Sequence, residues 1–161
     1  MADLDILSWI RDVRSRFLDR PAIECDRDTI TYADLVVRID AIADRLRAKG
    51  VTPGARVGVH MRRSHDLVAA LLAIWDPGAA YVPLPVDSPP ARNALVSDLA
   101  ELDLLVVDAG QDATRFPARG GMPLDKVAAL PDGGAGHAGE MRVPGDGNAL
   151  TYIMFTFVST G

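Results

Sequence analysis

The expected fold follows from the segment Ala149-Leu-Thr-Tyr-Ile-Met-Phe-Thr-Phe-Val-Ser-Thr-Gly161, which has the pattern of a buried strand that enters a polar loop. Apolar, β-branched and aromatic residues from Leu150 to Phe155 predict the strand. Hydroxyl groups and backbone N–H groups beyond the carboxyl end of a strand can bind the oxygens of an anion. The residues of this loop that could do so are Thr156, Ser159, Thr160 and Gly161. An ordinary turn has a similar sequence, so the remaining residues must distinguish the two.

Composition and charge limit the classes of protein to consider. The chain has 161 residues, 48% of them hydrophobic and 24% charged, which is typical of one soluble globular domain. Its net charge of −5 and its dispersed basic residues argue against nucleic acid or an anionic membrane as a partner. No apolar run approaches the roughly 20 residues that a membrane-spanning helix needs.

The cysteine and histidine content bears on localisation and on metal binding. The N-terminus, Met1-Ala-Asp-Leu-Asp5, is acidic where a signal peptide is basic, and Cys25 is the only cysteine. Since one cysteine cannot form an internal disulfide, we expect a cytoplasmic protein. The three histidines, His60, His65 and His137, are separated in the sequence and predict no metal site.

Apolar periodicity predicts that strands and helices alternate along the chain. In chain order we expect a helix over 3–18, a hairpin of 22–25 and 29–31, a helix over 31–49, a strand over 56–61, a helix over 64–74, a strand over 79–83, a helix from Pro89 onward and a strand over 104–107. Strands that are apolar on both faces and alternate with helices indicate a parallel sheet. The expected fold class is therefore α/β, with a mainly parallel sheet and helices on both faces, in a single domain over 1–161.

Local signals predict the ends of these elements and their buried faces. Thr31-Tyr-Ala-Asp34 resembles a capping box, and Gly50 suits the left-handed residue that ends the helix. Ser64 is expected to cap the next helix. The residues predicted to be buried are Leu35, Ile39, Ile42, Leu46, Val57, Leu71, Val82, Val106 and, on or after the helix that follows Pro90, Leu95, Leu99 and Leu102.

Glycine is frequent throughout residues 109–148, where neither helical nor strand periodicity persists. We expect a glycine-rich loop, interrupted by a short strand over Met122–Leu124, and mobility is its simplest interpretation. No G-x-G-x-x-G sequence follows any expected strand, so the sequence gives no support to a dinucleotide site.

Several motifs in a fixed order resemble one known family. They are Ile30-Thr-Tyr-Ala-Asp-Leu35, Gly50-Val-Thr-Pro-Gly-Ala-Arg-Val-Gly58, Gly78-Ala-Ala-Tyr-Val-Pro-Leu84, Pro89-Pro-Ala-Arg92 and Tyr152-Ile-Met-Phe-Thr-Phe-Val-Ser-Thr-Gly161. Their order resembles that of the AMP-forming adenylating enzymes, and most closely the adenylation domains of nonribosomal peptide synthetases. The similarity runs from about Asp19 to Gly161, so the chain resembles the N-terminal part, or first subdomain, of such a domain.

This resemblance implies a reaction and a cofactor. Enzymes of the family join a carboxylate to ATP and release pyrophosphate, which leaves an acyl-adenylate. The last motif contacts the ATP phosphates in the family, and by resemblance this role falls on Thr156, Ser159, Thr160 and Gly161, with magnesium as the accompanying ion. The resemblance assigns no catalytic residue and no metal ligand in this chain. Tyr32 and Tyr81 belong to the motifs but are expected to pack in the core.

The chain also departs from the family pattern. Phe157 stands where the family has a small hydroxyl residue, and Val158 stands where it has a glycine. Because a β-branched residue resists a positive φ and both side chains crowd a phosphate, we expect weak ATP binding. Asp76-Pro77 replaces the usual Lys-Ala, a change expected to lie at the surface. The family's substrate pocket, ribose-binding aspartate and mobile C-terminal subdomain would all follow Gly161.

Two functions remain open at this point. The chain could be the N-terminal fragment of an amino-acid-activating domain, inactive alone, or a truncated non-catalytic relative that acts as an interaction or structural partner of a synthetase. The matching motifs favour the first function, whereas Phe157 and Val158 favour the second. A stand-alone nucleotide-binding module needs an intact loop and is the weakest interpretation. The residues that would select the substrate lie outside this sequence, so it predicts no particular amino acid.

The C-terminal strand predicts a partner. In the family its neighbours come from later residues, so Ile153, Phe155 and Phe157 are expected to leave an open strand edge and an apolar face. Such edges and patches rarely persist in soluble monomers. We therefore expect self-association, or binding of a second protein chain, through residues 150–156. The alternative is that the loop over 109–148 folds back and covers this face.

Overall fold

The computed structural model describes residues 16–25, 28–124 and 150–155. Its elements are β1 (Pro21–Cys25), β2 (Asp28–Thr31), α2 (Tyr32–Ala48), β3 (Arg56–His60), α3 (His65–Trp75), β4 (Ala80–Pro83), α4 (Pro90–Ala100), β5 (Leu104–Asp108) and β6 (Gly121–Leu124). The expected order from the hairpin to β5 is confirmed, and β6 confirms the short strand in the glycine-rich region. Most of the helix expected over 3–18, and residues 125–148 of the loop, lie outside the described residues.

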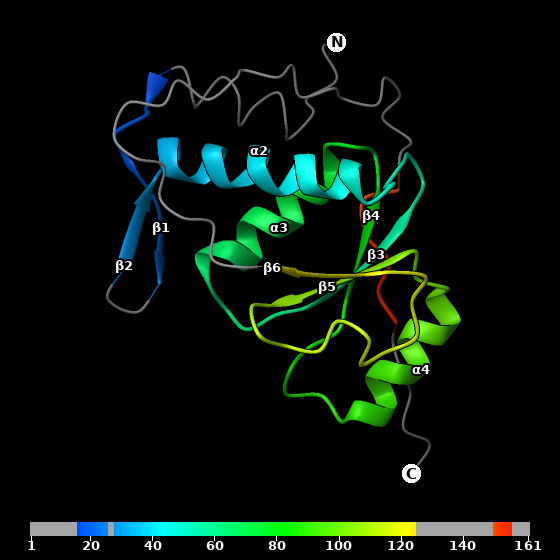
Figure 1. The fold of residues 1–161 in the computed structure, drawn as a ribbon. Helices are drawn as coiled ribbons and strands as arrows, with labels where there is room; N and C mark the ends of the chain where they lie inside the picture. The colour runs from blue at the N-terminus through cyan, green and yellow to red at the C-terminus, as the bar shows by residue number, and fades with distance from the viewer. Residues whose placement is uncertain (1–15, 26–27, 125–149, 156–161) are drawn as a thin grey trace.

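Four strands form one parallel sheet in the order β4-β3-β5-β6. In this register Gly58 of β3 lies between Val82 of β4 and Leu105 of β5. Helices α2 and α3 lie on one face of the sheet and α4 lies on the other (Figure 1). The predicted α/β class, with helices on both faces of a parallel sheet, is therefore confirmed. Strands β1 and β2 form a separate antiparallel hairpin.

The predicted helix ends are confirmed by their hydrogen bonds. Thr31 Oγ1 accepts the Asp34 backbone N–H at 3.2 Å, and the Thr31 backbone N–H donates to Asp34 Oδ2 at 3.0 Å, which completes the capping box of α2. Gly50 follows the helix with a φ of 82°, in the left-handed region that glycine tolerates. At the start of α3, Ser64 Oγ accepts the Leu67 backbone N–H at 3.1 Å.

The face covered by α2 and α3, called here the α2–α3 side, holds the larger core. Ile39, Ile42 and Leu46 of α2 are wholly buried there, as predicted. Leu71 of α3 was expected to be buried with them but is only partly buried. The buried residues of α3 include Ala69, Ala70, Ala73 and Ile74. Mostly small residues of α3 pack in the core, and Leu71 lies at the border of the core.

The face covered by α4, called here the α4 side, differs from the sequence prediction. Leu95 and Leu99 are 47% and 56% exposed, and only Leu102, which follows the helix, is buried as expected. The buried residues of α4 are Asn93, Val96, Ser97 and Ala100. Two of them are polar and bond to loop carbonyls, Asn93 Nδ2 to Pro85 O at 2.8 Å and Ser97 Oγ to Pro117 O at 2.6 Å. An apolar periodicity alone could not identify this face.

Asp76 corrects a further prediction, because it is not a surface residue. It is 4% exposed and forms an ion pair with Arg47 of α2. Asp76 directly follows the end of α3, where the negative end of the helix dipole disfavours a carboxylate. The Arg47 guanidinium offsets this charge and ties the C-terminal ends of α2 and α3 together.

The C-terminal segment, residues 150–155, is not the buried strand that the sequence predicts. It forms a single parallel bridge, between Tyr152 and Tyr81 of β4. Leu150, Tyr152 and Met154 are 58%, 50% and 65% exposed, and β4 is the only described strand beside the segment. Ile153 and Phe155 point the other way and pack, partly buried, against the core of the α4 side, which also contains Phe116 of the loop before β6.

Candidate functional site

The carboxyl ends of the parallel strands form the edge of the sheet where a ligand site is expected. The chain passes from β3 to β4 on one side and then to β5 on the other, so the strand order reverses at β3. Open α/β sheets bind ligands outside the carboxyl ends of their strands, beside such a reversal. The residues at this edge include His60 of β3, Leu84 after β4 and Asp108 of β5.

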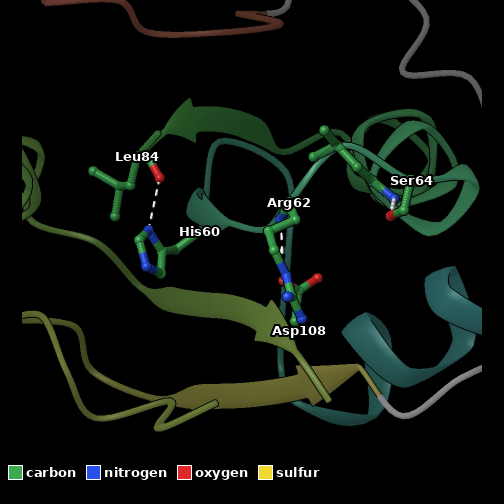
Figure 2. A network of polar contacts seen from close by, with 6 residues as sticks. His60, Arg62, Ser64, Leu84 and Asp108 are labelled. Atoms are coloured by element: carbon green, nitrogen blue, oxygen red, sulfur yellow. Dashed lines mark hydrogen bonds and ion pairs between the residues drawn. The ribbon is translucent and has the colours of Figure 1, made fainter. Parts of the chain in front are cut away.

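An ion pair joins the ends of β3 and β5 at this edge (Figure 2). Asp108 Oδ2 accepts the backbone N–H of Arg62 at 3.1 Å and the Nε–H of the same residue at 3.3 Å. The Arg62 side chain is mostly exposed, whereas the Asp108 side chain is mostly buried. This ion pair connects the ends of β3 and β5 and neutralises the charge of the Arg62 guanidinium.

His60 forms a second link at the same edge (Figure 2). Its Nδ1 lies 2.8 Å from the carbonyl oxygen of Leu84. Since a carbonyl oxygen only accepts hydrogen bonds, Nδ1 must carry the proton. The buried ring also meets Phe116 edge to face, with centroids 5.0 Å apart and planes at 83°. These contacts give His60 a structural role, which is to join β3 to the segment after β4.

Sequence reasoning did not select His60, Arg62 or Asp108 as a group. The signal available in the sequence was that His60 and Asp108 lie at or next to the ends of two apolar strands. Their meeting depends on the pairing of β3 with β5, which places His60 opposite Val107 and which a pattern of single strands does not give.

The predicted phosphate-binding residues Thr156, Ser159, Thr160 and Gly161 lie outside the described residues. The described segment that precedes them runs parallel to β4, so it leads toward the carboxyl edge of the sheet. The Tyr81 backbone N–H donates to Thr151 O at 3.2 Å, and the Ile153 backbone N–H donates to Tyr81 O at 3.0 Å.

Two observations concern binding of a nucleoside triphosphate with magnesium at the described part of this edge. Arg62 is paired with Asp108, so its charge is already balanced. No three His, Cys, Asp or Glu residues in the described ranges are grouped to hold a metal ion. No helix of the described part is long and apolar enough to cross a membrane.

Comparison with known proteins establishes the family. The family described as AMP-binding enzyme matches residues 10–161. The chain belongs to this family. Tyrocidine synthase 3 of Brevibacillus parabrevis is 32% identical over 160 residues, 99% of this chain and 2% of that protein. Syringomycin synthase SyrB1 of Pseudomonas syringae pv. syringae is 33% identical over 150 residues, 93% of this chain and 24% of that protein.

Solved structures of the family agree with these matches. The N-terminal subdomain of Klebsiella oxytoca NpsA superposes with a TM-score of 0.65 at 26% identity, over 73% of this chain and 31% of that one. The AMP-binding family member described here thus corresponds to the N-terminal part of nonribosomal peptide synthetase adenylation domains, as its motifs indicated. It spans less than a third of the length of each of these three proteins.

Proposed function

We propose that this chain is the N-terminal part of an ATP-dependent, amino-acid-activating domain of nonribosomal peptide synthesis. Residues 1–161 act as one subdomain of that unit, with 109–148 as a glycine-rich loop within it. The observation that carries the proposal is the parallel placement of residues 150–155 beside β4, joined by the Tyr81–Tyr152 bridge. This placement directs the following loop toward the carboxyl edge, where α/β folds bind ligands.

In this proposal the loop after Phe155 holds the phosphates of ATP. The hydroxyl groups of Thr156, Ser159 and Thr160 and the backbone N–H of Gly161 supply the hydrogen-bond donors. ATP with its magnesium ion would supply the α-phosphorus that a carboxylate attacks, which forms the acyl-adenylate as the bond to the departing pyrophosphate breaks. Phe157 and Val158 crowd the phosphates, so the affinity for Mg·ATP is expected to be weak.

The chain alone is proposed to be inactive. Catalysis of this kind consists mainly of positioning the reactants and neutralising charge. At the described carboxyl edge, the Arg62 guanidinium could neutralise charge, but it is already paired with Asp108. The remaining donors and the substrate pocket must come from the other parts of an adenylation domain. A cytoplasmic location, where ATP is abundant, belongs to the same proposal.

A chimera tests this function. The chain replaces the matching N-terminal part of a relative's adenylation domain, and ATP–pyrophosphate exchange is measured with that relative's substrate. The expected result is weak exchange, which Phe157→Ser together with Val158→Gly raises and Ser159→Ala in that background removes. If the doubly substituted chimera folds, binds the substrate and still shows no exchange, the chain does not supply a working phosphate loop.

A second candidate is a non-catalytic relative that binds a synthetase or another copy of itself. The observations that favour it are Phe157 and Val158 in the loop, and the outward side chains of Leu150, Tyr152 and Met154 on an edge with one described neighbour. Light scattering on the chain, with and without residues 150–161, tests the partner. A monomer in both forms, with no bound protein recovered from a pull-down, would contradict association through this segment.

A further inference from the structure

Trp75, the last residue of α3, bonds directly to the C-terminal segment. Its indole Nε1–H donates to the carbonyl oxygen of Thr151 at 2.9 Å. The same oxygen accepts the Tyr81 backbone N–H, and Ile153 donates to the Tyr81 carbonyl. The indole therefore adds a side-chain hydrogen bond from α3 to the two backbone hydrogen bonds that β4 makes with this segment.

Three aromatic rings strengthen this attachment. The rings of Trp75 and Tyr81 have centroids 6.0 Å apart and planes at 35°, and those of Tyr81 and Tyr152 have centroids 5.9 Å apart and planes at 24°. Aromatic pairs at such distances stabilise a contact beyond the area they bury. The rings come from α3, β4 and the segment, so they link the segment to the helix layer through the strand.

We propose that Trp75 is a positioning residue for the loop that begins at Thr156. The segment has one bridge to β4 and exposes Leu150, Tyr152 and Met154, so backbone pairing alone holds it at few points. The indole fixes Thr151 relative to α3 and thereby fixes the direction in which the chain reaches the carboxyl edge. The expected effect on ATP binding rests on the proposed function, whereas the expected effect on the attachment of residues 150–155 does not.

Amide hydrogen exchange of the full 161-residue chain, measured by NMR in native conditions, tests the attachment. Trp75→Phe keeps an aromatic ring and removes the N–H. The Ile153 and Tyr81 amides, which bond between β4 and the segment, are expected to exchange about three- to tenfold faster, because one hydrogen bond of ordinary strength is lost. The Ala80 and Leu84 amides, which bond toward Ala55 and Val59 at β3, serve as the internal reference and should not change.

Two controls separate the N–H from ring size and from general loss of stability. Benzothienylalanine at position 75, in a Trp9→Phe background, keeps the bicyclic shape without the N–H and should accelerate the same two amides. Ser97→Ala removes a comparable hydrogen bond, to Pro117 O on the α4 side, and should leave the ratio of Ile153 to Ala80 exchange unchanged. Equal acceleration of all four amides in Trp75→Phe, or no acceleration, would overturn the positioning role.

The chimera described above provides the functional readout. Trp75→Phe is expected to raise the KM for ATP about three- to tenfold and to leave the KM for the amino acid unchanged, because only the phosphate loop loses its support. Equal increases in both values would contradict the proposal. If the chimera with Trp75 shows no exchange at all, the proposed function fails, while the amide measurement still decides the role of Trp75 in holding the segment.

Discussion

On the α2–α3 side of the sheet the large apolar residues of α2 are buried, whereas on the α4 side Leu95 and Leu99 face solvent. The C-terminal segment, at the β4 edge, adds three more exposed apolar residues, Leu150, Tyr152 and Met154. The two sides share one sheet, so the difference lies in what covers them.

This difference shows that the described residues cover the large apolar side chains on one side of the sheet more completely than on the other. On the α2–α3 side the helices have their caps, and the buried Asp76 is paired with Arg47. The α4 side and the adjacent edge expose apolar side chains in the described part of the chain, and the chain spans only part of the length of its relatives. The proposed function accounts for this difference, because an N-terminal part of an adenylation domain needs cover where the rest of the domain joins it.

The largest expected effect contrasts the two sides directly. Ile42→Ala removes a wholly buried side chain of α2 and should lower the free energy of unfolding by about 2–5 kcal/mol. Leu99→Ala, on the exposed face of α4, should change it by no more than about 0.5 kcal/mol. Urea denaturation of both variants gives the values. Similar losses would mean that the α4 leucines are covered in solution.

The ion pair between Arg47 and the buried Asp76 provides a second test of the α2–α3 side. Arg47→Ala leaves the buried Asp76 carboxylate without its partner and should cost about 1–3 kcal/mol, the cost of a buried polar group left unpaired. Asp76→Ala should cost less, because the Arg47 side chain is 43% exposed and keeps Asp44, 2.9 Å away, as a partner. Thermal or urea unfolding would show which variant loses more stability. A larger loss for Asp76→Ala than for Arg47→Ala would mean that the Asp76 carboxylate is in contact with water.

Gly58 tests how closely the α4 side is packed at its centre. A Cβ at this position would lie 2.4 Å from Leu102 Cδ1 and 3.2 Å from Leu105 Cδ1. Gly58→Ala should therefore cost about 1–3 kcal/mol through overpacking. If the clash is the cause, adding Leu102→Ala should cost less in the Gly58→Ala background than in the wild type. Additive losses in urea denaturation would exclude this explanation.

The smallest effect concerns the start of α2 and depends on pH. The hydrogen bonds from the Thr31 hydroxyl and then from the Thr31 backbone N–H lower the pKa of Asp34 below its ordinary value of 3.8. A carboxylate whose pKa is depressed by folding stabilises the fold above its unfolded pKa, and this contribution is lost as the pH falls through the folded pKa. Thr31→Ala should thus cost about 1 kcal/mol at neutral pH. Below pH 3.8 the difference from wild type in urea denaturation should shrink, and a constant difference would contradict the role of Asp34.

The sequence predicted the elements well where one kind of pattern sufficed. Thr31, Asp34 and Ser64 predicted helix starts because capping depends on residues close in the chain. The alternation of strands and helices can also be recognised along the chain, and it predicted the parallel sheet. The family motifs placed the phosphate loop by resemblance, and its residues lie outside the described part of the chain.

Predictions that depended on distant contacts were less successful. Leu95 and Leu99 were assigned to the core because they are apolar, but Asn93 and Ser97 are buried there to bond with the carbonyls of Pro85 and Pro117. Asp76 was assigned to the surface as a replacement of the family's usual lysine, but it is buried beside Arg47, a partner on another helix that the local sequence does not reveal. The pairing of strands likewise decides which residues meet at the carboxyl edge, and the sequence of one strand does not contain that information.

ATP–pyrophosphate exchange by complementation tests the central claim most directly. The purified chain is assayed across the standard amino acids, first alone and then with the remaining part of a relative's adenylation domain added as a second polypeptide. The account predicts no exchange by either part alone and measurable exchange when both are present, increased by Phe157→Ser with Val158→Gly. Robust exchange by the chain alone, with contaminating synthetases excluded, would contradict the claim that this scaffold is one part of a larger adenylate-forming domain.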